Sequence, residues 1–254
     1  MRTRGFSLVE LSIVLVILGL LVGGVLGGRA LVNAAQLRTV SADVQRYKAA
    51  VYTFRDKYFY LPGDMPNATS FWGDQATGTD ACADAAVVDG TPGTCNGDGN
   101  GLINGIESFR LWQQLARAGI IEGSYTGYKG TMGINHTIPG QNAPITKYSG
   151  SGIAAYEFSV PGGPMSSRDF VYDYGNQFFY GGVNVSDYPE EPLFSPEEAW
   201  NIDTKMDDGK PGTGSVIASR HDLCTNSSSG TDYTTTYKLT SSGALCRFRF
   251  KQAF

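Results

Sequence analysis

A long apolar run near the start is the strongest pattern in the chain. Between Phe6 and Gly28 the single charged residue is Glu10, and at ~1.5 Å per residue a helix of this length crosses a bilayer. Arg2 and Arg4 precede the run and favour an N-terminus that stays in the cytoplasm. The pattern predicts a single-pass transmembrane helix over residues 6–28.

The helical pattern continues beyond the apolar run, over residues 29–60. Apolar residues recur there at alternating steps of three and four, which places them on one face of an amphipathic helix. They are Leu37, Val40, Val44, Tyr47, Val51, Phe54 and Tyr58. Polar residues, Asp43 among them, are expected on the other faces. The sequence Leu61-Pro62-Gly63 predicts the end of the helix.

Residues 61–254 form a globular domain rich in Gly, Asn, Ser, Thr and Asp. Short apolar segments predict strands at 155–160, 170–174, 177–180, 215–218, 233–239 and 245–250. Apolar periodicity predicts a helix over 107–121. The expected fold class is α+β, with the long N-terminal helix packed on an antiparallel β-sheet.

The charges and the polar side chains exclude some functions. The net charge is −4, and removal of residues 1–5 with their two arginines leaves 18 basic against 24 acidic residues, or −6. Such a domain, with no basic stripe, is not expected to bind nucleic acid as a whole. His136 and His221 lie far apart in sequence, and no nucleophile, metalloprotease or phosphate-loop motif occurs. We therefore expect that the chain is not an enzyme.

Four cysteines fall into two local pairs, Cys82 with Cys95 and Cys224 with Cys246. Their spacing matches no common zinc motif. An even number of cysteines in a polar, loop-rich domain behind a membrane anchor predicts two disulfides in an oxidising compartment. The alternative is four free, buried thiols.

The residues Arg4-Gly5-Phe6-Ser7-Leu8-Val9-Glu10 resemble the signal of type IV pilins and type II secretion pseudopilins. The resemblance consists of a basic leader, a glycine, an aromatic residue and one glutamate ahead of an apolar run. It implies a leader at residues 1–5, cleavage between Gly5 and Phe6 by prepilin peptidase, and N-methylation of Phe6. In such a subunit Glu10 pairs with the Phe6 amine of a neighbour during assembly.

The same resemblance implies partners and a location. The subunit begins in the bacterial inner membrane as a single-pass protein, with its C-terminal domain in the periplasm. An inner-membrane assembly platform then adds it to a filament of pilins or pseudopilins, in the periplasm or on the cell surface. The Cys224–Cys246 segment resembles the disulfide-bounded C-terminal loop of many pilins.

Residues 96–107 fit the twelve-position calcium loop. Its expected ligands are Asn96, Asp98, Asn100, Leu102 through its backbone, and Glu107. Asn at the first position, instead of Asp, removes one charge and weakens affinity. The expected cofactor is Ca²⁺, and the alternative is a Gly-Asn turn that caps the helix beginning at Glu107.

A second acidic cluster contains Asp203, Asp207 and Asp208. It resembles the acidic calcium-binding loop of major pseudopilins. The sequence Asp207-Asp208-Gly209 is also typical of a tight turn. Metal binding and a turn therefore remain alternatives.

The leading hypothesis is a structural filament subunit of a type IV pilus or a type II secretion pseudopilus. A second is a pilin-like adhesin or DNA-uptake minor subunit that acts as a binding module. A third is a membrane-anchored periplasmic protein that does not polymerise. Glu10 favours the first, because a carboxylate in an apolar helix is unfavourable unless it has a partner.

Overall fold

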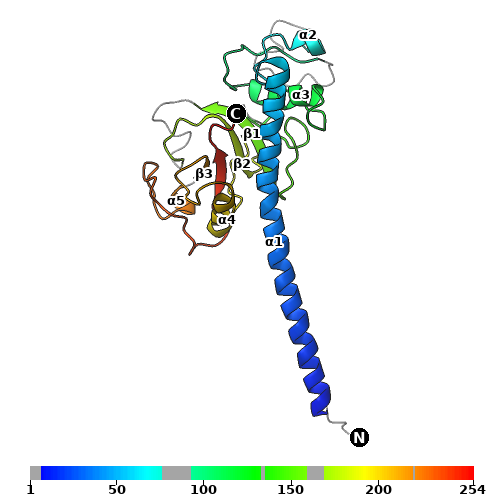
Figure 1. Ribbon diagram of the computed structural model, residues 1–254, viewed down its shortest axis with the longest axis vertical. Helices are drawn as coiled ribbons and strands as arrows, with labels where there is room; N and C mark the ends of the chain where they lie inside the picture. The colour runs from blue at the N-terminus through cyan, green and yellow to red at the C-terminus, as the bar shows by residue number, and fades with distance from the viewer. Residues whose placement is uncertain (1–6, 76–92, 133–134, 159–168, 220) are drawn as a thin grey trace.

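The computed structural model describes residues 7–75, 93–132, 135–158, 169–219 and 221–254. Its first element is one continuous helix, α1 (Leu8–Tyr58), of 51 residues. The second half of α1 lies along the globular domain, and the first half projects away from it (Figure 1). The glycines between Gly19 and Gly28 do not interrupt the helix.

Both ends of α1 are capped by local contacts. The Ser7 hydroxyl accepts a hydrogen bond from Val9 N, and the Glu10 side chain accepts one from Ser7 N. At the other end Phe59 has φ 64° and ψ 11°, and its N–H donates to Arg55 O at 2.7 Å. Glycine is the usual residue in this left-handed conformation, which costs other residues about 1–2 kcal/mol.

The apolar stripe of α1 is buried in the main core, as the periodicity predicts. Its buried members are Leu37, Val40, Val44, Tyr47, Val51 and Phe54, and Tyr58 is partly buried. Asp43 is also buried, contrary to the sequence expectation. Its carboxylate accepts hydrogen bonds from Lys147 N at 2.9 Å and from the Tyr180 hydroxyl at 3.2 Å, so a polar contact inside the core fixes the rotation of the helix.

A four-stranded antiparallel sheet forms the rest of the core. Its order is β1 (Ser151–Phe158), β2 (Gly175–Gly182), β4 (Arg247–Phe250) and β3 (Val216–Ser219). Alternation along β2 and β4 directs Phe178, Tyr180, Phe248 and Phe250 into the same core as α1. The α+β architecture is therefore the expected one.

The opposite face of the sheet holds a buried ion pair. Arg249 Nη2 lies 2.8 Å from Asp169 Oδ2 and 3.3 Å from Glu190 Oε1, and both Arg249 and Asp169 are buried. Burial alone would raise the pKa of Asp169, but Arg249 and Arg247 outweigh it and lower this pKa. The loops that cover this face are therefore held in place by ion pairs as well as by aromatic packing.

The described part of the domain also contains four shorter helices: α2 (Thr69–Trp72), α3 (Glu107–Arg117), α4 (Pro196–Met206) and α5 (His221–Cys224). Helix α3 is buried on nearly all sides, including its polar residues. The buried Gln114 side chain accepts from Gly63 N at 2.7 Å and donates to Cys95 O at 3.2 Å. Helix α3 thus binds the loops on either side of α2 as well as the apolar core.

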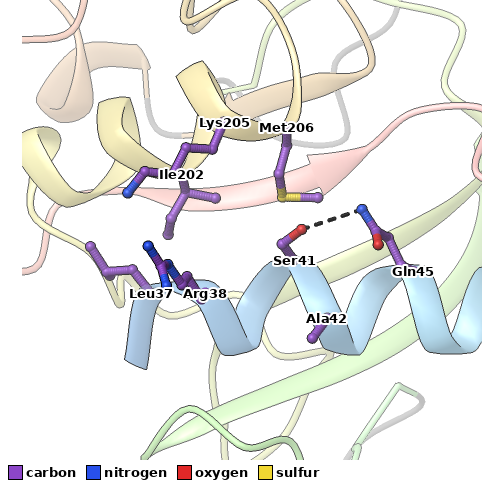
Figure 2. Close-up of a pocket in the computed structure, with 8 residues that line it drawn as sticks. All are labelled: Leu37, Arg38, Ser41, Ala42, Gln45, Ile202, Lys205 and Met206. Atoms are coloured by element: carbon purple, nitrogen blue, oxygen red, sulfur yellow. Dashed lines mark hydrogen bonds between the residues drawn. The ribbon is translucent and has the colours of Figure 1, made fainter. Parts of the chain in front are cut away.

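Helix α4 packs beside α1 and begins with a capping box. Ser195 and Glu198 exchange side-chain and backbone hydrogen bonds, and Pro196 occupies the first helical turn. Figure 2 shows Ile202 and Met206 of α4 facing Leu37, Ser41 and Gln45 of α1. A groove of about 200 Å³ remains between the two helices.

Several sequence-based boundaries need correction. Residues 170–174 form no strand, because Phe170 and Tyr174 pack across the outer face of the sheet against Ile217. Residues 233–239 make one isolated bridge, at Tyr237, whose side chain is buried. The helix from Glu107 ends at Arg117 rather than 121, shortly before Gly119 with φ +71°. Helix α4 was not expected at all.

One predicted disulfide, Cys224–Cys246, is present, with a Cα–Cα distance of 5.0 Å. It joins α5 to the residue before β4, and both cysteines are buried. Cys95 is also disulfide-bonded, but its predicted partner Cys82 lies outside the described residues.

We expect Phe59→Gly to raise the free energy of unfolding by ~1 kcal/mol, because glycine adopts positive φ without a Cβ clash. The Phe59 side chain is 85% exposed, so little packing is lost. Thermal melting of the detergent-solubilised chain measures the effect. Tyr60→Gly, one residue further on, is the control and should lower the melting temperature. A lower melting temperature for Phe59→Gly would contradict the strain argument.

Candidate functional site

Glu10 lies in the first turn of α1, at the start of its exposed half. Its Oε2 accepts a hydrogen bond from Ser7 N at 2.8 Å. Its other oxygen, Oε1, makes no hydrogen bond to any residue that the structure describes. One oxygen of the carboxylate therefore caps the helix start. Gly5 and Phe6 lie outside the described residues.

The half of α1 that follows Glu10 is apolar and is not buried against any part of the domain that the structure describes. Its most apolar stretch has a mean hydropathy of 2.6 and is fully exposed. Among the described residues, α1 is the one helix long and apolar enough to cross a membrane. Apolar side chains surround this half on every side, from Leu8 to Val32. Such a surface is typical of a helix that lies in lipid or among other helices.

The comparisons with known proteins agree with this geometry at the N-terminus. A family model described as the prokaryotic N-terminal methylation motif matches residues 1–26. Residues 1–26 carry a pilin-type signal. Searches of curated proteins and of solved structures found no match. The signal supports a type IV pilin-like or pseudopilin-like protein anchored through α1, of a structural rather than an enzymatic class.

The globular domain of this pilin-like chain contains a cluster of three carboxylates, Asp64, Asp98 and Glu107. Each offers an oxygen, and these oxygens lie within 4.8 Å of one another. Asp64 follows the end of α1, Asp98 lies in the loop after Cys95, and Glu107 begins α3. The calcium-loop pattern predicts Asp98 and Glu107 as ligands but not Asp64, because Leu61-Pro62-Gly63 predicts only the end of a helix.

Two glycines allow the segments of this carboxylate cluster to approach. Gly63 has φ +92°, and a Cβ there would lie 2.5 Å from Glu107 O. A Cβ at Gly97 would overlap the backbone of Asp64. Asp64 accepts hydrogen bonds from the N–H groups of Gly99, Asn100 and Gly101 at 2.7–3.0 Å. The loop is therefore wrapped around a buried carboxylate.

The other expected calcium ligands differ in their placement. Asn96 Oδ1 accepts from Thr69 N at 2.9 Å, so this side chain holds the start of α2. Asn100 donates to Asp98 Oδ2 at 2.8 Å and accepts from Leu102 N at 2.7 Å, which keeps it beside the cluster. The structure thus brings together part of the expected set and adds Asp64 from outside the loop.

The electrostatics of this cluster suit a cation. Burial raises the pKa of Glu107 to about 7, although N–H donors from Asn104 and Asp98 act in the opposite direction. Burial also raises the pKa of Asp64. Buried carboxylates that face one another are unfavourable when all are ionised, and a divalent cation with a preference for oxygen ligands would relieve that repulsion.

The second cluster, Asp203, Asp207 and Asp208, also has oxygens within 4.8 Å. Asp203 is buried in α4 and accepts from the Tyr237 hydroxyl at 2.7 Å. Asp207 accepts from Val216 N at 3.0 Å, and Asp208 accepts from Lys210 N at 2.9 Å. Burial raises the pKa of Asp203 to about 7. These bonds connect α4 to β3 and to the C-terminal segment, so the cluster organises a turn.

We expect Glu107→Gln to stabilise the metal-free protein near neutral pH. The folded state binds the Glu107 proton more tightly than the unfolded state, so the unfolding free energy falls as pH rises from about 4.5 to about 7. Replacement of this titrating carboxyl should recover about 1–2 kcal/mol at pH 7.5, once solvent screening is allowed for, and nothing at pH 4. Melting in a chelator at both pH values tests this, with the exposed Glu122→Gln as control. Equal melting of Glu107→Gln and the parent at pH 7.5 would contradict it.

Proposed function

We propose that this chain is a structural subunit of a type IV pilus or a type II secretion pseudopilus, built into the filament through α1. The observation that carries the proposal is the division of α1 into a fully exposed apolar half and a half with one buried face. The exposed half requires a nonaqueous environment. A bilayer supplies it before assembly, and the α1 helices of other subunits supply it afterwards.

The dimensions of α1 support this sequence of environments. The exposed half from Leu8 to Gly28 spans ~31 Å at 1.5 Å per residue, close to the bilayer core of about 30 Å. The subunit would therefore begin as a single-pass protein of the bacterial inner membrane, with its N-terminus in the cytoplasm and its domain in the periplasm. Arg2 and Arg4 fit that orientation.

Processing by prepilin peptidase creates the N-terminal amine that assembly requires. Cleavage after Gly5 leaves the Phe6 amine at the new N-terminus, where it is methylated and remains cationic. One oxygen of Glu10 in one subunit then accepts a hydrogen bond from this amine of its neighbour, while the other oxygen still caps α1. Two charges that are unfavourable in an apolar environment compensate each other, which sets the axial register between subunits as the assembly platform inserts each one.

We expect Glu10→Gln to reduce sheared filament yield at least tenfold while membrane insertion is retained. Gln keeps an oxygen that can accept from Ser7 N but lacks the charge that pairs with the amine. Ser7→Ala is the matched control, because it removes the cap and keeps the charge. Electron microscopy and immunoblots of sheared and membrane fractions measure the outcome. Wild-type filament yield from Glu10→Gln would refute charge pairing as the assembly step.

We also propose that the domain binds Ca²⁺ through Asp64, Asp98 and Glu107, with Asn100 beside them. Three mutually close carboxylates, two of them buried with raised pKa values, support this assignment. The ion would join the end of α1 to the start of α3. The Asp203–Asp207–Asp208 cluster is a second, weaker candidate, because only one of its three carboxylates, Asp203, is buried.

Millimolar Ca²⁺ should raise the melting temperature of the full chain by several degrees, through binding to the folded state alone. Glu107→Gln should lose this increase although it stabilises the metal-free form. Asp208→Asn, in the other cluster, should keep it. An equal calcium shift in the parent and in Glu107→Gln would contradict the assignment, and a shift lost only in Asp208→Asn would transfer it to the second cluster.

A further inference from the structure

The end of the domain farthest from the membrane half of α1 exposes aromatic side chains. Phe59, just past α1, is 85% exposed, and Tyr60 is 38% exposed. Phe59 is also held in the left-handed conformation that disfavours a bulky residue. A strained backbone that presents an apolar side chain to solvent indicates a contact outside the subunit.

A hollow of about 410 Å³ lies beside these aromatic residues. Its apolar walls include Phe59, Tyr60, Leu61 and Phe254, Arg55 also lines it, and its polar side is formed by Asp64 and Asn100 of the carboxylate cluster. The Arg55 side chain is exposed and lies over the Tyr52 ring at 4.7 Å. On the side away from Asp64 the hollow therefore offers aromatic surfaces and the Arg55 cation, which together favour an aromatic side chain with a carboxylate next to Arg55.

The opposite end of the domain presents such a pair on α4. Trp200 is 41% exposed, and the exposed Glu197 lies one turn before it on the same face. Asn33 donates to Glu198 at 3.3 Å, which places the first turn of α4 next to the beginning of the domain-bound half of α1. Figure 1 shows α4 on the membrane-proximal side of the domain and the end of α1 on the distal side.

We infer that Trp200 of a second copy of this chain occupies the hollow, with its Glu197 against Arg55. This inference rests on the proposed function, because parallel α1 helices staggered along a filament bring the distal end of one domain to the proximal end of another. The two surfaces differ, so the contact is head-to-tail and repeats without closing, as a filament requires. Aromatic and arginine side chains are also those that contribute most at interfaces.

The contact fixes an axial displacement between the two copies. The hollow lies level with Phe59, and Trp200 lies near the level of Asn33, 26 residues earlier on α1. At 1.5 Å per residue this corresponds to ~35–40 Å along the helix. The pair formed by the Phe6 amine and the Glu10 carboxylate joins two copies with a much smaller axial offset. The domain contact therefore joins subunits that are further apart along the filament.

Filament yield from full-length variants tests the inference. Phe59→Gly and Trp200→Ala should each reduce sheared filaments at least fivefold, and Phe59→Gly should do so without lowering the melting temperature. Arg55→Glu and Glu197→Arg should each reduce the yield, and the double variant should recover to within twofold of the parent. Lys48→Glu, an exposed cation elsewhere on α1, and Leu239→Ala, an exposed apolar residue, serve as controls and should assemble normally.

The outcomes separate this contact from the proposed function. Normal filaments from Phe59→Gly and Trp200→Ala, with filaments lost in Glu10→Gln, would overturn the head-to-tail contact and leave the filament role intact. Loss in the Phe59 and Arg55 variants alone would mean that another molecule occupies the hollow. Failure of the charge-reversed pair to recover would likewise contradict the Glu197–Arg55 contact. Parent-level filaments in all variants, Glu10→Gln included, would overturn both the head-to-tail contact and charge pairing. An absence of filaments containing the parent chain itself would refute the filament role.

Discussion

Burial of one face of α1 in the domain core is the contact on which the other features depend. Apolar residues from Leu37 to Phe54 pack with the sheet, and Asp43 adds hydrogen bonds that resist rotation about the helix axis. Because α1 is continuous, this contact also fixes the direction of the exposed half. The domain thus presents defined surfaces relative to the membrane, and later relative to a filament axis. A flexible joint between the halves would remove that relation.

Carboxylates are stabilised in three different ways in the chain. Asp169 is paired with Arg249, and its pKa falls in spite of burial. Asp64 is surrounded by backbone N–H groups, yet its pKa is raised, as is that of Glu107. Glu10 keeps one oxygen on its own helix start. The first arrangement is complete within the subunit, whereas the other two leave carboxylate charge that a cation or a neighbouring amine can compensate.

The periodic parts of the sequence were sufficient to predict α1, its buried stripe, α3 and the β-strands at 177–180 and 245–250. Apolar spacing is a local property, and these elements follow it. Asp64 could not be recognised as part of the carboxylate cluster, because its approach to Glu107 depends on a turn at Gly63 and on tertiary packing. Helix α4 was missed although Ser195, Pro196 and Glu198 form a capping box, a signal present in the sequence. Residues 170–174 have strand composition but bury their aromatic rings from a loop.

The filament role requires a free, methylated amine at Phe6. No contact within the subunit can replace this amine. Intact-mass spectrometry of subunits from sheared filaments measures it directly. We predict a chain that begins at Phe6, carries one added methyl group and lacks residues 1–5. Recovery of the chain only from membranes, with the Gly5–Phe6 bond intact, would contradict the account.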